Sequence, residues 1–302
     1  MDAMNSSPLQ SAAALSDTDH QDSYTHLADA YRDDAARPNG ERIELIKRGI
    51  VIEHAAYTAA MDYAHWILSQ PVGTPGRGML LTGEPGVGKS TFGEELVGSS
   101  EGRIVMISAE GARSMRELYG RVLQSLDGPV ARSMHTPDRE LAVIRLFKAL
   151  DVIGLAVDEI QDLAKGTQRE HQQVLLAIKY LTNVARIPLF CLGTPESERA
   201  FRGDKPLAKR LRAFQLPQWK LDQSFVDLIT TIEEMLPLRK ASAIRNEAAL
   251  KYLLEISGGS LREIMARIAC AAVRAILSGE ESLALMGLQE AEFAPARSER
   301  DR

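Results

Sequence analysis

Residues 83–90 constrain the fold of this chain more than any other stretch. They read Gly-Glu-Pro-Gly-Val-Gly-Lys-Ser and match the phosphate-binding pattern G-x-x-x-x-G-K-[ST]. The apolar run at 78–82 predicts a short buried strand before the loop, and residues 91–96 can open a helix after it. Glycines let successive N–H groups point at phosphate oxygens, and the helix N-terminus adds partial positive charge. A chance glycine-rich turn is the alternative, and the strand–loop–helix context argues against it.

The loop predicts a site for ATP and Mg²⁺. Lys89 would reach the β- and γ-phosphates, and the Ser90 hydroxyl would hold the metal ion. The residues expected to surround the nucleotide are Gly83, Glu84, Pro85, Gly86, Val87, Gly88, Lys89, Ser90 and Thr91.

Two carboxylates end a later apolar strand, predicted over residues 152–157. Asp158 would lie beside the phosphate loop and bind Mg²⁺, directly or through water. Glu159 could polarise the attacking water as a general base. Taken alone, the pair also fits a helix cap or a solvated acidic turn. Its position after the phosphate loop, with one strand between, favours the metal and base roles.

Further polar residues have two or more interpretations. Thr194 follows the strand-like run 188–193 and can orient the lytic water, or simply begin a turn before proline. Arg262 falls in the first turn of a predicted helix, where it could point at the nucleotide or cover its own helix. The most basic window contains Arg199, Arg202, Lys205, Lys209, Arg210 and Arg212. That window fits a solvated face, a nucleic-acid patch, or an arginine finger that offsets transition-state charge in a neighbouring subunit.

Alternation of strands and helices predicts an α/β fold with a parallel sheet. The expected strands are 78–82, 103–108, 152–157 and 188–193, and the expected helices between and before them are 41–70, 112–126, 141–150 and 168–185. From about residue 223 the strand signal vanishes, and 224–236, 246–257 and 260–278 are predicted helices. The predicted segments are an acidic, disordered arm (1–40), a nucleotide-binding domain with a helical lead-in (41–220), a helical lid (221–286) and a flexible tail (287–302).

Composition limits the class of protein. Residues 1–39 hold seven aspartates and two arginines, which account for the net charge of −5, so the remainder is neutral. Any DNA contact must therefore come from a local patch. Neither a membrane span nor a signal pattern is evident, and Cys191 and Cys270 fit free thiols of a reducing cytoplasm.

The set of residues resembles an AAA+ ATPase and, more narrowly, the TniB/TnsC family of transposition ATPases. The matching elements are 83–90 (Walker A), 153–159 (Walker B), Thr194 (sensor 1), Arg210 within 207–214 (arginine finger, with Arg212 the close rival) and Arg262 (sensor 2). The narrower resemblance comes from residues 158–163, 192–196 and 210–219. AAA+ proteins often carry asparagine at sensor 1, so Thr194 is a departure that bears on the hydrolysis rate rather than on nucleotide binding.

The resemblance implies a parallel five-stranded sheet flanked by helices, with a small all-α lid. It also implies ATP-dependent assembly on double-stranded DNA, with nucleotide between neighbouring subunits, marking of a target site and recruitment of a separate transposase. A finger acting in trans requires a head-to-tail interface, which gives rings or helical filaments. DNA would be held mainly through its phosphates. Candidate contacts are Arg113, Arg116 and Arg121, whose near-helical spacing equally fits a solvated face.

Slow ATP turnover would then time disassembly. Two other classes would share every nucleotide-site residue: an AAA+ ATPase of a secretion or remodelling system, and a helicase- or clamp-loader-type ATPase.

Overall fold

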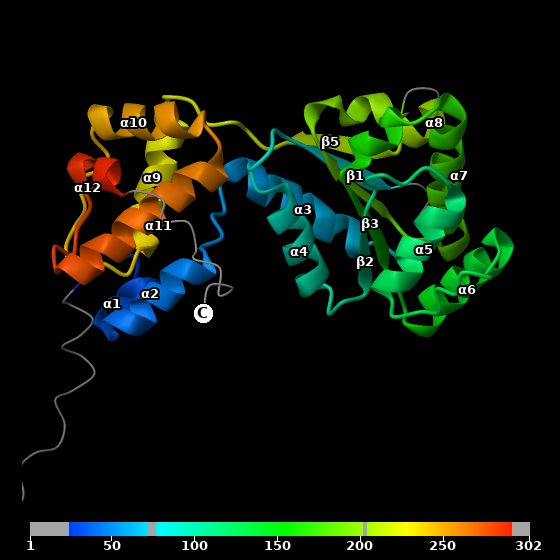
Figure 1. The fold of residues 1–302 in the computed structure, drawn as a ribbon, viewed down its shortest axis with the longest axis horizontal. Coiled ribbons are helices and arrows are strands. Elements are labelled where there is room, and N and C mark those ends of the chain that lie inside the picture. The colour runs from blue at the N-terminus through cyan, green and yellow to red at the C-terminus, as the bar shows by residue number, and fades with distance from the viewer. Residues whose placement is uncertain (1–23, 72–76, 202–203, 292–302) are drawn as a thin grey trace, which may run out of the picture. The chain divides into compact units, whose positions relative to one another are not determined.

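The computed structural model describes residues 24–71, 77–201 and 204–291 of the 302-residue chain. It divides into two compact units (Figure 1). The α/β unit comprises Val51–Leu221 and Leu253–Met265. The helical unit comprises the described residues of Met1–Ile50, Asp222–Tyr252 and Ala266–Arg302.

A five-stranded parallel sheet forms the centre of the α/β unit, and the predicted fold class is confirmed. Its strands are β1 (Gly78–Thr82), β2 (Ile104–Ser108), β3 (Gly154–Asp158), β4 (Leu189–Gly193) and β5 (Leu211–Gln215). Their order is β2-β3-β4-β1-β5, with every neighbouring pair parallel. The first four strands agree with the expected ranges, whereas β5 lies in the basic run, for which no strand range was predicted.

Helices cover both faces of this sheet. The α-helices are α3 (Ala55–Leu68), α4 (Lys89–Ser99), α5 (Met115–Ser125), α6 (Thr136–Ala149), α7 (Gln168–Ala185) and α8 (Lys205–Ala208). Two 3₁₀ segments, η2 (Ile160–Lys165) and η3 (Pro195–Phe201), follow β3 and β4. A capping box at Thr167 and Glu170 explains why α7 begins where it does.

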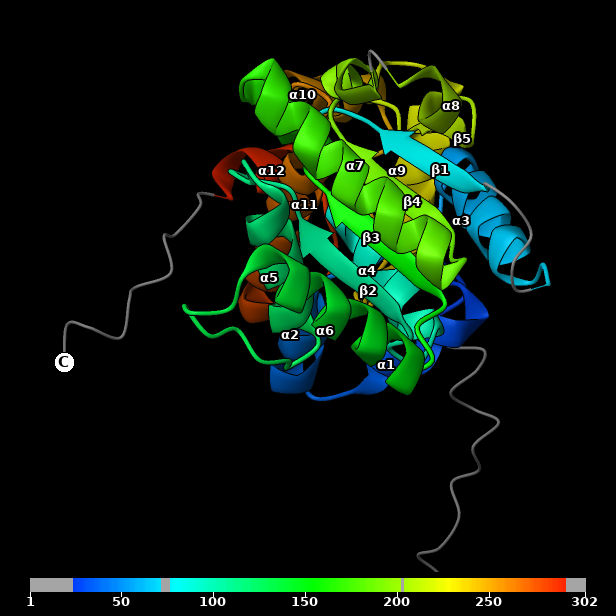
Figure 2. The same ribbon diagram turned by 90° about the vertical axis from the view of Figure 1, so that its right-hand side faces the viewer.

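Alternating strand residues feed two apolar cores. In β1, Met79 and Leu81 join the core shared with α3 and α4, while Leu80 joins the core under α5, α6 and α7. Successive strand side chains point to opposite faces, so a strand covered on both sides must be apolar throughout. Figure 2 views the sheet from the side of α5, α6 and α7.

The helical unit combines the two ends of the described chain. It contains η1 (Asp29–Tyr31), α1 (Arg32–Ala36), α2 (Asn39–Arg48), α9 (Gln223–Met235), most of α11 (Leu261–Ser278), α12 (Leu285–Glu290) and the first half of α10 (Glu247–Ser257). The backbone N–H of Ala28 donates to the carbonyl of Glu234 at 3.0 Å, which ties the N-terminal segment to α9.

Residues 41–70 are not the single helix that the periodicity predicts. Gly49, with φ of +85°, ends α2, and α3 begins at Ala55. Residues 24–50 therefore fold with α9 to α12 rather than forming a lead-in to the sheet. Of the predicted disordered arm (1–40) and flexible tail (287–302), residues 1–23 and 292–302 lie outside the described residues. The described part of the arm is instead ordered, since it forms η1 and α1, and α12 extends into the predicted tail as far as Glu290.

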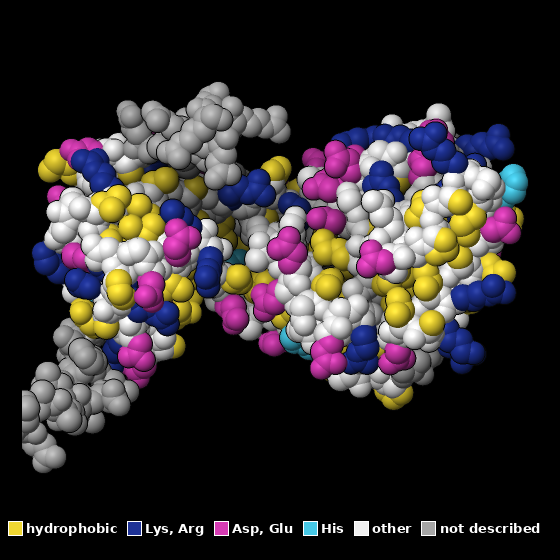
Figure 3. Space-filling view, turned by 60° about the horizontal axis from the view of Figure 1, so that its bottom comes forward, with side chains coloured by type: hydrophobic (Ala, Val, Ile, Leu, Met, Phe, Trp, Pro, Cys, Tyr) yellow, Lys and Arg dark blue, Asp and Glu magenta, His cyan; other side chains and the backbone are white. Residues whose placement is uncertain are grey.

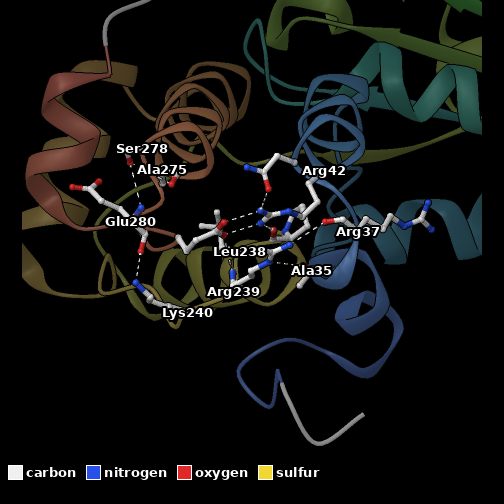
Figure 4. Close-up of polar contacts among 12 residues, drawn as sticks. Ala35, Arg37, Arg42, Leu238, Arg239, Lys240, Ala275, Ser278 and Glu280 are labelled. Carbon is white, nitrogen blue, oxygen red and sulfur yellow. Dashed lines mark hydrogen bonds and ion pairs between the residues drawn. The ribbon is translucent and has the colours of Figure 1, made fainter. Parts of the chain in front are cut away.

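A buried ion pair joins α2 to the C-terminal part of the helical unit. Arg42, completely buried, donates two hydrogen bonds of 2.7 Å to the two carboxylate oxygens of Glu281, and a third to the carbonyl of Pro237. Arg239 lies alongside, where its guanidinium donates to the carbonyls of Ala35 and Arg37 (Figure 4). Bidentate pairing of this kind fixes geometry, because both donors must meet both acceptors.

Both cysteines are free, and Cys191 is buried in β4 while Cys270 is partly buried. Burial raises the pKa of the Cys191 thiol, which keeps it protonated. Among the described helices, none is long and apolar enough to cross a membrane.

The ion pair predicts an acid-sensitive helical unit. The hydrogen bonds from Arg42 hold the pKa of Glu281 below its ordinary value, against the opposing effect of burial. A carboxyl whose pKa is lowered in the folded state stabilises the fold above its unfolded pKa of about 4.3, and this contribution is lost as the pH falls through the folded pKa. We expect Glu281→Gln to cost about 3 kcal/mol at neutral pH, because Arg42 is left as an unpaired buried charge.

The measurement is urea unfolding followed by circular dichroism. Both tryptophans, Trp66 and Trp219, belong to the α/β unit, so their fluorescence provides an internal reference. Glu280→Gln, which changes an exposed neighbouring carboxylate, is the matched control. An equal shift of the dichroism transition by both variants would contradict the role given to the ion pair.

Candidate nucleotide site at the carboxyl edge of the sheet

The phosphate loop connects β1 to α4 and has the backbone that its glycines predict. Gly86 and Gly88 have φ of +80° and +104°, in the left-handed region, and Gly88 caps the N-terminus of α4. At Gly83 a Cβ atom would lie 2.6 Å from Val87 Cγ2, so the loop closes tightly there. The N–H groups at the start of α4 and the helix dipole make this turn suited to an anion.

Lys89 lies inside the loop and is 7% exposed. Its Nζ donates to the carbonyl oxygens of Gly83 at 2.8 Å and Glu84 at 2.9 Å. Burial lowers the pKa of Lys89, although the carboxylates of Glu159, Asp158 and Glu84 act in the opposite direction. The carbonyl oxygens of the loop itself thus hold the ammonium in place.

The structure brings Ser90 and Asp158 together, with Glu159 directly after Asp158. Ser90 Oγ donates to Asp158 Oδ2 at 3.2 Å, and the backbone N–H of Glu159 donates to Asp158 Oδ1 at 2.8 Å. A hydroxyl and a carboxylate oxygen are the ligands Mg²⁺ prefers, so this pair fits the predicted ion. Glu159 has φ of +52°, an uncommon value for a non-glycine residue that turns the chain sharply after β3.

Thr194 lies at the neighbouring strand end, but its hydroxyl faces Glu196. The hydrogen bond from Thr194 lowers the pKa of the Glu196 carboxyl, and the carbonyl of Thr194 accepts from the N–H of Ser197 at 2.9 Å. Its own N–H donates to Gln161 Oε1 at 3.1 Å. The turn-forming interpretation of Thr194 therefore describes its contacts, and its predicted action on water stays a prediction.

Arg262 reaches the loop from the first turn of α11. Its backbone N–H donates to the carbonyl of Gly86 at 2.9 Å, and a Cβ atom at Gly86 would lie 2.4 Å from Ser260 Oγ. The positive charge of Arg262 also contributes to lowering the pKa of Lys89. The first turn of α11 belongs to the α/β unit, which explains how a residue far along the chain joins the site.

Arg210 and Arg212 lie at or near the amino end of β5. The carbonyl of Arg210 accepts from the N–H of Gly78, at the start of β1, whereas the phosphate loop begins after Thr82. At about 3.3 Å per residue the two ends of β1 are roughly 13 Å apart, more than an arginine side chain spans. Neither the start of β5 nor Arg210 is therefore adjacent to the chain's own phosphate loop.

These two arginines differ in their contacts. The guanidinium of Arg210 is exposed and donates to Asn183 Oδ1 at 3.1 Å. That of Arg212 lies over the rings of Tyr63, at 4.8 Å, and Phe214, at 5.3 Å. Arg202, from the same basic window, lies outside the described residues.

The three arginines suggested for DNA contact each donate to backbone carbonyls of the α/β unit. Arg113 bonds the carbonyl of Asp162, Arg116 that of Arg132, and Arg121 those of Ser108 and Glu110. A guanidinium has five N–H donors, so these contacts occupy only part of each group.

Gln161 lies within residues 158–163, which carry the family resemblance, but nothing in the sequence indicates a role for it. In the structure its amide joins Glu159 to Thr194 and Ser197. A contact spanning 33 residues leaves no signal in local spacing, since it depends on how β3 and β4 pair.

Comparison with solved structures identifies the fold. The chain is similar to the Aeropyrum pernix ORC2 protein in its ADPNP–ADP complexes (TM-score 0.60, 16% identity, 83% of this chain and 70% of that chain). It is also similar to a chain of Drosophila ORC bound to DNA (0.53, 15%, 96% and 70%) and to AMPPCP-bound DnaA from Aquifex aeolicus (0.51, 14%, 80% and 66%). At these identities the likeness establishes an AAA+ fold and no more.

No curated protein sequence matches the chain. The model of the bacterial TniB protein family does match it, over residues 42–221. That range contains the whole sheet, the phosphate loop and both Walker B carboxylates. This protein is therefore a member of the TniB family.

Proposed function

We propose that this chain is an ATPase that assembles on double-stranded DNA in the cytoplasm and regulates transposition by marking the target site and recruiting a separate transposase. The observation that carries the proposal is that Lys89, Ser90, Asp158, Glu159 and the first turn of α11 meet at the carboxyl ends of the strands in a TniB family member. A phosphate loop alone indicates a nucleotide and nothing about its use, so the role in transposition depends on the family.

The loop residues would bind ATP, and each neighbouring side chain has a distinct task. Lys89 would contact the β- and γ-phosphates, and Ser90 with Asp158 would hold Mg²⁺, which when bound offsets phosphate charge. Glu159 would accept a proton from the attacking water. Arg262 would approach the phosphates from the first turn of α11. Thr194 would orient water from the end of β4.

Completion of the site by a second copy is the proposed reason for assembly. Arg210 directly precedes β5, at the amino ends of the strands and opposite the ends that carry the phosphate loop, so it would act on the nucleotide of a neighbouring subunit. We prefer it to Arg212 because the cation–π contacts of Arg212 already hold that guanidinium against its own subunit. Such head-to-tail contacts produce rings or filaments.

DNA binding is supported by the family and by a similar structure that contains DNA, that of Drosophila ORC. On the face shown in Figure 3, acidic and basic side chains are interspersed over each unit. Contacts would therefore come from small groups such as Arg113, Arg116 and Arg121, directed at phosphates and tolerant of sequence. A secretion or remodelling ATPase would need no such contacts, whereas a helicase- or clamp-loader-type ATPase would share the nucleotide site.

The nucleotide assignment predicts two different losses. Lys89→Ala should abolish ATP binding, because the ammonium supplies the charge at the β- and γ-phosphates. Glu159→Gln should retain binding and lose turnover, by about 10²- to 10⁴-fold for removal of a general base. Isothermal titration with ATP and a phosphate-release assay measure the two quantities. Normal turnover by Glu159→Gln would disprove the assignment of the base.

The assembly assignment predicts nucleotide-dependent structures on DNA. Mixed with duplex DNA, the protein should form rings or filaments with ATP or a slowly hydrolysed analogue, and not with ADP. Negative-stain microscopy detects them, and Lys89→Ala is the control that should form none. Absence of DNA binding at low salt in every nucleotide state would exclude the transposition role and favour a protein-remodelling ATPase.

A further inference from the structure

We propose that Gln161 is a positioning residue for ATP hydrolysis, which holds the carboxylate of Glu159 toward the site through its side-chain amide. The proposal depends on the ATPase function given above and adds a residue to its machinery. Gln161 Nε2 donates to Glu159 Oε2, so one oxygen of the carboxylate is held and the other can accept a proton from water.

The amide of Gln161 is itself fixed by the turn after β4. Its Oε1 accepts from the backbone N–H of Thr194 at 3.1 Å and from Ser197 Oγ at 3.3 Å. Ser197 is completely buried, which limits movement of the second donor. Because a backbone N–H can only donate, the carbonyl end of the amide must face Thr194 and the NH₂ end must face Glu159. The orientation of the amide is therefore determined by its contacts.

Gly193 provides the space that this arrangement requires. A Cβ atom at that position would lie 2.3 Å from Gln161 Oε1 and 2.2 Å from Ser197 Oγ, both far below any real contact distance. Its position at the end of β4, pairing with Thr82 at the end of β1, leaves the turn little freedom to move away. A side chain at residue 193 would thus displace the amide from Glu159.

This connection explains how the β4 turn can affect catalysis although the Thr194 hydroxyl faces Glu196. The N–H of Thr194 acts on Glu159 through Gln161, across two hydrogen bonds. Glu159 stands in a left-handed backbone conformation and has a flexible side chain, so its carboxylate needs a partner to stay in one place. A base displaced by about 1 Å can lose up to about 100-fold in rate.

The test compares steady-state ATP hydrolysis of the full chain with duplex DNA present. Gln161→Met keeps the length of the side chain and removes both amide contacts, and we expect kcat to fall about 10- to 100-fold while KM for ATP changes less than about threefold. Gln172→Met, which changes an exposed glutamine on α7, is the matched control. Gly193→Ala should reproduce the loss of kcat with ATP binding retained.

A double-mutant cycle separates positioning from general loss of structure. If Gln161 acts through Glu159, adding Gln161→Met to Glu159→Gln should cause no further loss of kcat. The proposal would be overturned if Gln161→Met lowered kcat by the same factor in the Glu159→Gln background as in the wild-type protein. An unchanged kcat in Gln161→Met would overturn it as well. Failure of the wild-type protein to hydrolyse ATP would instead overturn the proposed function itself.

Discussion

The parallel pairing of β1 between β4 and β5 is the constraint on which the site depends. Parallel strands end at a common edge, so the segments that follow Thr82, Asp158 and Gly193 meet there although they are far apart in sequence. The same pairing places the start of β5 at the amino ends of the strands, on the opposite side of the sheet from the phosphate loop. The parallel pairing thus places the phosphate loop and the carboxylates at one end of the strands and Arg210 at the opposite end.

We therefore propose that one copy of the chain does not form a complete nucleotide site by itself. The chain supplies Lys89, Ser90, Asp158 and Glu159 from one edge of its sheet, and it would offer Arg210 to a neighbour from the other. In the proposed assembly, bound nucleotide would control when neighbouring subunits stay together. Gln161 would hold the carboxylate of Glu159, the proposed base, in position at the carboxyl ends of the strands.

Much of this could be predicted from the sequence, because the signals are local. The phosphate loop, four continuous apolar strands and three C-terminal helices each follow from residues close together in the chain. The strand β5 was not predicted because Leu211–Gln215 mixes apolar with charged side chains and is partly exposed, as the outermost strand of the sheet. The helical break at Gly49 was missed because a periodic apolar pattern continues on both sides of it.

What the sequence could not provide were the contacts made across long separations. The Arg42–Glu281 pair spans 239 residues, and nothing near either residue indicates that the two are partners. Gln161 belongs to the same category, since its importance depends on Thr194 and Ser197. Buried polar networks of this kind become visible once the fold places their members together.

A mixing experiment tests the shared site most directly. Lys89→Ala would lack its own nucleotide but keep Arg210, and Arg210→Ala would bind nucleotide but lack the finger, so each alone should be inactive on duplex DNA. Their mixture should recover ATP hydrolysis, whereas Arg210→Ala mixed with the double variant Lys89→Ala/Arg210→Ala, which supplies no Arg210, should not. If Arg212 is the finger instead, Arg212→Ala should be inactive alone and Arg210→Ala should hydrolyse ATP. An Arg210→Ala protein that hydrolyses ATP at the wild-type rate, or a mixture that stays inactive, would contradict the account.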